Sequence, residues 1–264
     1  MRSFKEKITT TVVPLSGAWV ASNSSYATEI MSMAGFDVLI IDCEHTAIDF
    51  SDIHRHVQAA HSCRNDIGVF VRVPEIDKSF VKRVLDIGIA GIIFPNTETK
   101  ENVHDIINCC FYPPIGCRGI STSMTRASKF GLNKEYINNA NDTLILTVQI
   151  ESKKAIENIE EIMSFQEIDM IFVGKKDLSM DMGIFGNYLD ESLIQAIKGI
   201  ESLAKNNGKL LATSIAYKNE EKELVNKGYS LITIGSDVSI LSKYSKMLVE
   251  TFNNISKGDL NNVT

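Results

Sequence analysis

The sequence contains no uninterrupted apolar run of 18 or more residues, so no segment predicts a membrane-spanning helix. Its first residues include no apolar stretch long enough for a secretory signal, and we therefore expect a cytoplasmic protein that does not contact a membrane. An excess of basic residues is also lacking. The net charge is -6, whereas a nucleic-acid-binding surface usually carries a basic stripe, so we expect no nucleic-acid partner.

Cysteines are few, and their spacing matches no zinc-binding pattern. Their number is five, and an odd number argues against a set of paired disulfides. We interpret all of them as reduced thiols that serve mainly in packing. They are Cys43, Cys63, Cys109, Cys110 and Cys117.

Short, continuous apolar runs recur along the whole chain. Such runs, without alternation of polar and apolar residues, are typical of parallel strands covered on both faces. Helix-like segments separate them, several opening at an aspartate or threonine that suits an N-cap, and glycines follow many of their ends. The runs lie at residues 17–20, 38–41, 69–71, 91–94, 144–148, 170–173, 209–212 and 231–234.

Eight strands alternating with helices predict an α/β fold, a (β/α)8 TIM barrel, as a single domain over residues 1–264 with a polar tail at about 256–264. The structural alternative is an open doubly wound sheet. That fold usually has a glycine-rich turn after its first strand, and residues 21–24 contain no glycine. Residues 112–141 form the longest interruption, which we interpret as a long loop.

Polar residues follow the predicted strands at their C-terminal ends, where barrels carry their chemistry. Each one alone has a simpler interpretation. His45 fits a loop residue, Arg72 fits an ion pair with Glu75 or Asp86, Glu151 fits a first-turn acid, and Asp177 fits an N-cap. Their gathering at one end of one barrel favours a functional site. The full set comprises Asp42, Glu44, His45, Arg72, Gln149, Glu151, Gly174, Asp177, Thr213 and Ser214.

Two carboxylates without a matching pair of histidines indicate a hard divalent cation, Mg²⁺ or Mn²⁺, with Co²⁺ as a further candidate. Two protein ligands would leave most of an octahedral coordination sphere open. A small substrate with adjacent carboxylate and keto oxygens could occupy the open positions.

Several motifs, spread in order over nearly the whole chain, resemble those of the HpcH/HpaI aldolases, the metal-dependent class II pyruvate aldolases of the phosphoenolpyruvate/pyruvate barrel superfamily. LIIDCEH, VQIE and the FVG..DLS..MG pattern together carry the resemblance. The matching stretches are 35–45, 69–77, 84–99, 116–121, 125–131, 146–152, 169–183 and 232–241.

The resemblance implies roles for individual residues. Glu151 and Asp177 would bind the metal, His45 would act with Asp86 in proton transfer, and Arg72 would stabilise the enolate oxygen of pyruvate. A further group would bind substrate or order water near it. This group consists of the backbone amides around Gly174 and Lys176 together with Asp42 and Gln149.

The implied activity is that of an aldehyde-lyase. It would reversibly cleave a 4-hydroxy-2-oxo acid, such as a 2-keto-3-deoxy sugar acid, to pyruvate and an aldehyde through a metal-stabilised pyruvate enolate. The alternatives are an oxaloacetate decarboxylase, a citryl- or malyl-thioester lyase of the same superfamily, and a non-catalytic binding protein on the same barrel. The resemblance also implies a homo-oligomer, a hexamer built from smaller units.

One position departs from the family pattern. Members usually carry a proline after the glycine that ends the sixth strand, whereas this chain reads Gly174-Lys175-Lys176-Asp177. The change frees a backbone amide and adds two charges near the expected metal site. Recognition of the substrate at this turn is therefore expected to differ, and the altered turn is what supports the binding-protein alternative.

Overall fold

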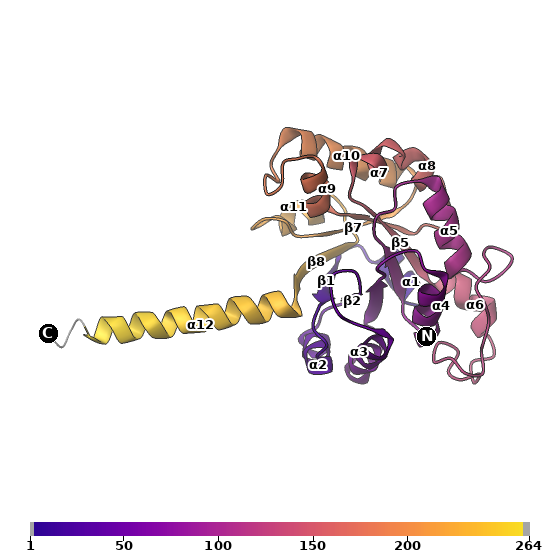
Figure 1. Ribbon diagram of the computed structural model, residues 1–264, viewed down its shortest axis with the longest axis horizontal. Coiled ribbons are helices and arrows are strands. Elements are labelled where there is room, and N and C mark those ends of the chain that lie inside the picture. Colours follow the sequence, from indigo (N-terminus) through magenta and orange to yellow (C-terminus); the bar gives the residue numbers. More distant parts are fainter. Residues whose placement is uncertain (1–2, 261–264) are drawn as a thin grey trace.

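The apolar runs of the sequence form eight parallel strands that pair with their neighbours in chain order, and β8 closes on β1 (Figure 1). The computed structural model describes residues 3–260. The closed barrel confirms the predicted TIM-barrel architecture and excludes the open sheet. Its strands are β1 (Leu15–Val20), β2 (Val38–Asp42), β3 (Gly68–Arg72), β4 (Gly91–Phe94), β5 (Ile145–Ile150), β6 (Met170–Val173), β7 (Leu210–Ser214) and β8 (Leu231–Ser236).

Helices surround the barrel, and several begin where the sequence indicated. The side chains of Asp49, Asp77 and Thr99 accept hydrogen bonds from first-turn amides, and Gly35 and Gly88 end helices in the left-handed conformation. The helices are α1 (Phe4–Thr10), α2 (Ser25–Ala34), α3 (Phe50–Cys63), α4 (Lys78–Ile87), α5 (Lys100–Cys110), α6 (Tyr136–Thr143), α7 (Lys153–Glu157), α8 (Ile159–Met163), α9 (Lys175–Asp181), α10 (Glu191–Asn206), α11 (Glu221–Asn226) and α12 (Asp237–Leu260).

The apolar core has two layers that follow from strand geometry. Alternate residues of a strand point to opposite faces. In β2, Leu39 and Ile41 therefore pack with the helix-covered layer, while Val38 and Ile40 pack inside the barrel. Continuing the same alternation sends Asp42 into the barrel at the C-terminal end of β2. The interior thus changes from apolar to polar along the strand direction.

Some elements differ from the sequence-based expectations. Residues 112–141 are not all loop, because α6 begins at Tyr136. The helical segment between β5 and β6 is not continuous, because Asn158 separates α7 from α8. Residues 256–260 of the expected polar tail belong to α12, and residues 261–264 lie outside the described part.

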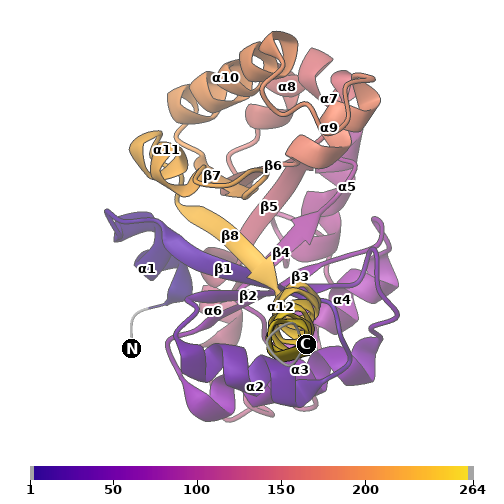
Figure 2. The same cartoon turned by 90° about the vertical axis from the view of Figure 1, so that its left-hand side faces the viewer.

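The last helix projects away from the barrel. Its first turns contact β8, β1 and α2, and the rest extends outward (Figures 1 and 2). Between residues 3 and 260, no helix combines the length and the apolarity needed to cross a membrane.

Candidate active site

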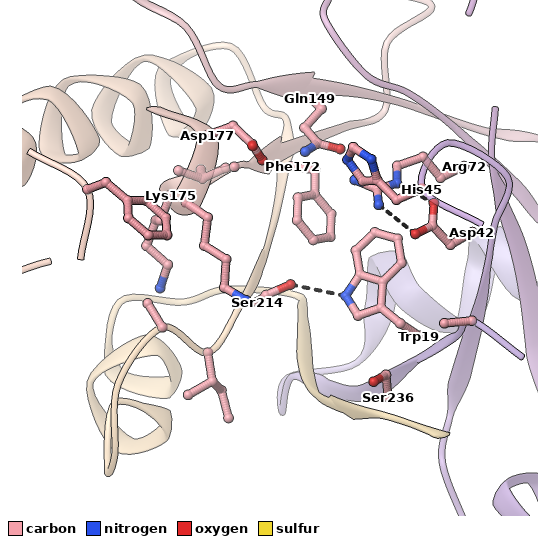
Figure 3. Close-up of a pocket in the computed structure, with 17 residues that line it drawn as sticks. Trp19, Asp42, His45, Arg72, Gln149, Phe172, Lys175, Asp177, Ser214 and Ser236 are labelled. Carbon is pink, nitrogen blue, oxygen red and sulfur yellow. Dashed lines mark hydrogen bonds and ion pairs between the residues drawn. The ribbon is translucent and has the colours of Figure 1, made fainter. Parts of the chain in front are cut away.

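A cavity of about 400 Å³ opens at the C-terminal ends of the strands (Figure 3). This is the end at which barrel enzymes carry their catalytic groups. Most of the residues singled out from the sequence line it, and they come from different strands and loops. The lining includes Asp42, His45, Arg72, Gln149, Gly174, Lys176 and Asp177.

Arg72 is held rigidly on the cavity wall. Asp42 and Arg72 are direct neighbours in the register of β2 and β3. The guanidinium donates Nε to Asp42 Oδ1 at 2.9 Å and Nη2 to Asp42 Oδ2 at 2.8 Å, a bidentate pair, while Nη1 lies 3.0 Å from Glu44 Oε2. An ion pair of Arg72 with Glu75 or Asp86, the simpler interpretation, is therefore wrong.

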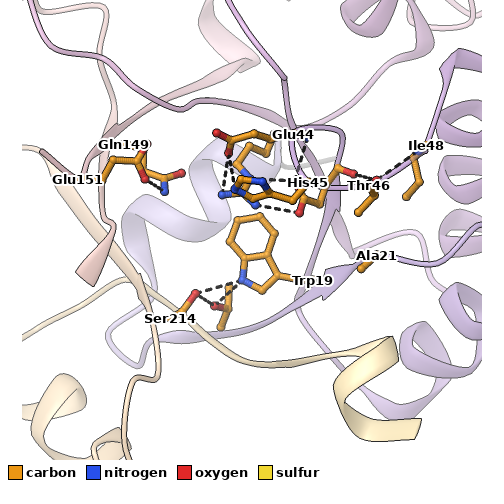
Figure 4. A network of polar contacts seen from close by, with 12 residues as sticks. Trp19, Ala21, Glu44, His45, Thr46, Ile48, Gln149, Glu151 and Ser214 are labelled. Carbon is orange, nitrogen blue, oxygen red and sulfur yellow. Dashed lines mark hydrogen bonds and ion pairs between the residues drawn. The ribbon is translucent and has the colours of Figure 1, made fainter. Parts of the chain in front are cut away.

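Trp19 packs against the Arg72 guanidinium, and the sequence did not identify it as a residue of the site. The Arg72 guanidinium lies 4.4 Å from the centre of its ring. The indole Nε1 donates to Ser214 Oγ at 3.1 Å and to Thr233 Oγ1 at 3.0 Å (Figure 4). The sequence did contain a feature that could have identified it, since Trp19 is the single tryptophan and lies at the end of the first strand.

Glu151 is a buried carboxylate, 6% exposed, beside the cavity. Its Oε1 accepts from the backbone N–H of Asn96 at 2.8 Å, and its Oε2 accepts from Gln149 Nε2. Burial, with the nearby carboxylates of Asp177 and Glu44, raises the pKa of Glu151 to about 7. Glu151 precedes α7 and its cap, so its interpretation as a first-turn helix acid is wrong.

Asn96 is a second residue of the site that the sequence did not identify. It has φ of 52°, in the left-handed region that asparagine tolerates better than most residues. This conformation turns its backbone N–H toward Glu151. The Asn96 side chain donates to Glu44 Oε1 at 3.3 Å, which links two carboxylates of the site.

The polar groups fit a divalent cation. Gln149 Oε1 is buried without a hydrogen-bond partner, although such oxygens normally have one. Together with the carboxylates of Glu151 and Asp177 it gives a set of oxygen donors, which suits Mg²⁺ or Mn²⁺. Within residues 3–260, no three His, Cys, Asp or Glu side chains gather closely enough to form a metal site alone. Water or substrate would have to complete the coordination.

His45 lies at the open rim of the cavity. Its side chain is 64% exposed, and its Nε2 lies 3.6 Å from Glu44 Oε2 (Figure 4). Burial raises the pKa of Glu44, and the adjacent Arg72 opposes that shift. Glu44 is therefore the carboxylate that the structure places beside the histidine.

Asp86, expected to act with His45, does not contact it within one chain. It lies near the end of α4, where Arg118 Nη2 donates to its Oδ1 at 2.7 Å. Because α4 runs back from the C-terminal end of β3 to the start of β4, its last turn lies at the opposite end of the barrel from His45.

The family model for the HpcH/HpaI aldolase/citrate lyase family matches residues 15–243. The chain belongs to this family. It is 32% identical over 236 residues to a 5-keto-4-deoxy-D-glucarate aldolase of Shigella boydii serotype 18, which covers 89% of this chain and 91% of that protein.

Solved structures of the HpcH/HpaI family agree in fold. A family protein of Burkholderia cenocepacia superposes with a TM-score of 0.89 at 28% identity, covering 94% of this chain and 98% of the other. An HpcH/HpaI aldolase of Desulfitobacterium hafniense superposes with a TM-score of 0.87 at 28% identity, covering 95% and 97% of the two chains.

The turn that departs from the HpcH/HpaI pattern leads directly into α9. A Cβ added at Gly174 would lie 2.6 Å from Glu151 Cβ and 2.8 Å from Glu151 Oε2, so this position requires glycine. Lys176 is exposed at the cavity, and Asp177 lies in the first turn of α9 rather than at its N-cap, which is Gly174. The Lys175 side chain, unlike that of Lys176, is buried and pairs with Glu220. Burial lowers the pKa of its ammonium group.

Proposed function

We propose that this HpcH/HpaI family member is a divalent-metal-dependent aldolase that reversibly cleaves a 4-hydroxy-2-oxo acid to pyruvate and an aldehyde. The observation that carries the proposal is the grouping of Glu151, Asp177 and the unpartnered Gln149 oxygen beside the fixed guanidinium of Arg72. The relationship to a 5-keto-4-deoxy-D-glucarate aldolase supports it.

Cleavage of a carbon–carbon bond next to a 2-oxo acid leaves an enolate, whose negative charge requires positive charge at the oxygen where it develops. Glu151 and Asp177 would hold the cation, Mg²⁺ or Mn²⁺ with Co²⁺ as a substitute, which would supply Lewis-acid polarisation of that oxygen when bound. Arg72 donates hydrogen bonds to the same oxygen, and Asp42 fixes the orientation of its guanidinium.

The proton of the substrate's 4-hydroxyl must leave as the bond breaks. In our proposal His45 accepts it at the cavity rim, and Glu44, 3.6 Å away, stabilises the imidazolium that forms. A proton must then reach the enolate carbon to give pyruvate. The amides around Gly174 and Lys176 hold the carboxylate of the 2-oxo acid. Asp86 takes no part in this step within one chain, since it is paired with Arg118.

A Schiff-base mechanism would need a lysine amine free to attack the substrate carbonyl. Lys175 lines the cavity, but its ammonium group is engaged by Glu220. The carboxylates of Glu151 and Asp177 would have no role in such chemistry. The metal-dependent route therefore agrees better with the site.

The test is proton exchange from pyruvate, which requires no knowledge of the aldehyde. The protein is incubated with pyruvate in heavy water with Mg²⁺, Mn²⁺ or Co²⁺, and NMR follows the loss of the methyl proton signal. We expect metal-dependent exchange that disappears with a chelator and in Glu151→Ala. Glu161→Ala is the control, since Glu161 lies on α8 in an exposed pair with Lys100.

Exchange that is absent with every metal, in a folded protein, would contradict the proposal. The same experiment addresses the site assignment, because exchange that persists in Glu151→Ala would place the reaction elsewhere.

The free state of all five cysteines agrees with a reducing compartment, and we propose a cytoplasmic location.

A further inference from the structure

A buried charge pair lies beside the cavity, and the proposed reaction gives it no direct role. Lys175 Nζ donates to Glu220 Oε1, and the two side chains are 6% and 5% exposed. The other carboxylate oxygen of Glu220 accepts from the backbone N–H of Ala216 at 2.6 Å. The pair therefore links the start of α9 to the connection between β7 and α11.

The pair lies at the turn that the proposed function assigns to the carboxylate of the 2-oxo acid. Lys175 is the first residue of α9, between Gly174 and Lys176 in the chain. All three residues line the cavity (Figure 3). The backbone conformation of residues 174–176 therefore determines where the amides assigned to the carboxylate point.

This turn is not fixed by its own sequence. Gly174 is the N-cap of α9 and has no side chain, because a Cβ there would lie 2.6 Å from Glu151 Cβ. Glycine has more backbone freedom than any other residue. Within residues 175–177 only Lys175 is buried, whereas Lys176 and Asp177 are exposed. The Lys175 side chain is therefore the side-chain anchor of the first turn of α9.

Stability alone does not account for the pair. Burying two opposite charges has a large desolvation cost, which their attraction offsets only in part. Glu220 makes no side-chain capping hydrogen bond to α11, the helix that it precedes. Proline suits the first position of a helix and fixes the backbone there without a charge, so α9 does not require lysine at this position.

We propose that Lys175 and Glu220 are positioning residues for binding of the 2-oxo acid. Their ion pair fixes the turn at residues 174–176 before the substrate arrives, so that the turn does not have to be ordered on binding. Lys175 acts through the turn and not through contact with the substrate. The inference rests on the proposed function, because it requires the 2-oxo acid to lie at this turn.

The test variant removes the ion pair without leaving a buried charge unpaired. Lys175→Met combined with Glu220→Gln replaces both charged groups by neutral side chains of similar length, so the protein should fold. The glutamine can still accept the Ala216 N–H, which keeps the connection after β7 in place. Lys209→Met is the matched control, because Lys209 is also buried but lies just before β7, at the opposite end of the barrel, and donates to backbone carbonyls.

The first measurement follows the turn itself and does not depend on catalysis. Hydrogen–deuterium exchange of the peptide covering residues 172–180 reports the amides of Gly174 and Leu178, which donate hydrogen bonds of 3.0 Å on either side of the turn. We expect faster exchange of this peptide in the double variant than in the wild type, and no change in Lys209→Met. Unchanged exchange in the double variant would overturn the proposal.

The second measurement is KM for pyruvate in the methyl-proton exchange, with kcat determined in parallel. We expect the double variant to raise KM about tenfold, the scale set by ordering one more backbone residue on binding. Because the chemical groups stay in place, kcat should remain within about threefold of the wild type. A purely structural role would change neither constant in the folded protein, as we expect for Lys209→Met. An unchanged KM, or a loss of kcat at constant KM, would overturn the proposal.

A proline variant separates backbone positioning from a direct effect of the lysine. Lys175→Pro combined with Glu220→Gln removes the same ion pair but fixes φ at the first position of α9. We expect this variant to restore slow exchange of the turn and to return KM to within about threefold of the wild type, because the turn is again ordered before binding. A KM that stays raised would show that the lysine acts on the substrate directly, and would overturn the positioning role.

The wild type separates this inference from the proposed function. Absence of pyruvate exchange in the wild type with every metal would overturn the proposed function, and with it the assignment of the turn to a 2-oxo acid. Metal-dependent exchange in the wild type, together with an unaltered KM in the double variant, would overturn the positioning role alone.

Discussion

At the residue scale, Glu151 is the most strongly perturbed carboxyl group of the candidate site. It is buried, and the nearby carboxylates of Asp177 and Glu44 disfavour its ionised form, which together raise its pKa to about 7. A cation at this position would reverse the balance, since it favours the ionised carboxylate. Metal binding at Glu151 should therefore release a proton near neutral pH.

The raised pKa makes the stability of the metal-free protein depend on pH. The folded state holds the Glu151 proton more tightly than the unfolded chain, whose glutamates titrate near 4.5. The free energy of unfolding should therefore be highest below that pH and fall as pH rises through about 7, by about 3 kcal/mol in all. Urea unfolding with a chelator at about pH 5 and about pH 8 measures this decrease in the free energy of unfolding. The Glu151→Gln variant should lack the part of the decrease that comes from Glu151. An identical pH dependence in the variant would contradict the prediction.

Arg72 gives a second prediction at this scale. Its guanidinium is fixed by two hydrogen bonds to Asp42 and lies over the Trp19 ring, a geometry that a lysine cannot reproduce. Arg72→Lys should slow pyruvate proton exchange by about a hundredfold or more, the usual effect of losing a placed donor to a developing oxyanion. Arg83→Lys is the control, because Arg83, on α4, stacks on Phe50 of α3. A variant with wild-type exchange would remove Arg72 from the mechanism.

At the element scale, the site depends on the close approach of β5 and β6 at their ends. Gly174 follows β6, and its backbone packs directly against the Glu151 side chain, so even one methyl group has no room. The strand ends are covered by buried neighbours on both sides and cannot separate freely. The position of the Glu151 carboxylate is thus fixed by the glycine opposite it.

Gly174→Ala should therefore destabilise the fold by about 1–3 kcal/mol and weaken Mn²⁺ binding, because the Glu151 carboxylate must move. The comparison is Gly199→Ala, in α10, where an added Cβ meets nothing within 4 Å. Alanine in a helix should stabilise that variant by about 0.5–1 kcal/mol. Urea unfolding and calorimetric Mn²⁺ titration measure both effects. Tight Mn²⁺ binding by a stable Gly174→Ala protein would count against the site as assigned.

The strand pattern made much of the site predictable. Once the strands are assigned, alternation along β2, β3 and β5 directs Asp42, Arg72 and Gln149 into the barrel at its C-terminal end. Contacts between distant segments are not encoded in any local pattern. The pairing of Lys175 with Glu220, 45 residues later, depends on how α9 meets the connection after β7. The role of Asp86 beside His45, which came from a motif and not from the direction of α4, stays a prediction, because within one chain Asp86 pairs with Arg118.

At the scale of the whole molecule, α12 is the element least covered by the rest of the chain. The helix projects from the barrel (Figure 1). Its apolar side chains Leu241, Tyr244 and Leu248, which share one face, are 70%, 58% and 52% exposed. Tyr26 and Ile30 on α2, near its base, are also exposed. Apolar patches of this size on a soluble surface usually mark an interface. We propose that α12 packs against a second copy of the chain, which agrees with the expected homo-oligomer.

Replacing two of these residues should separate the subunits. Leu241→Glu combined with Leu248→Glu, seven positions apart on α12, would place two charges in the proposed interface, where they cannot be paired. We expect light scattering after size exclusion to give a multiple of the chain mass for the wild type and the mass of one chain for the double variant. Lys246→Ala is the control, because it removes only an exposed pair with Glu250 on the same helix. A monomeric wild type, or an unchanged oligomer in the double variant, would rule out α12 as the contact. Circular dichroism of the separated chains should show reduced helix content, since a projecting helix without packing is only marginally stable.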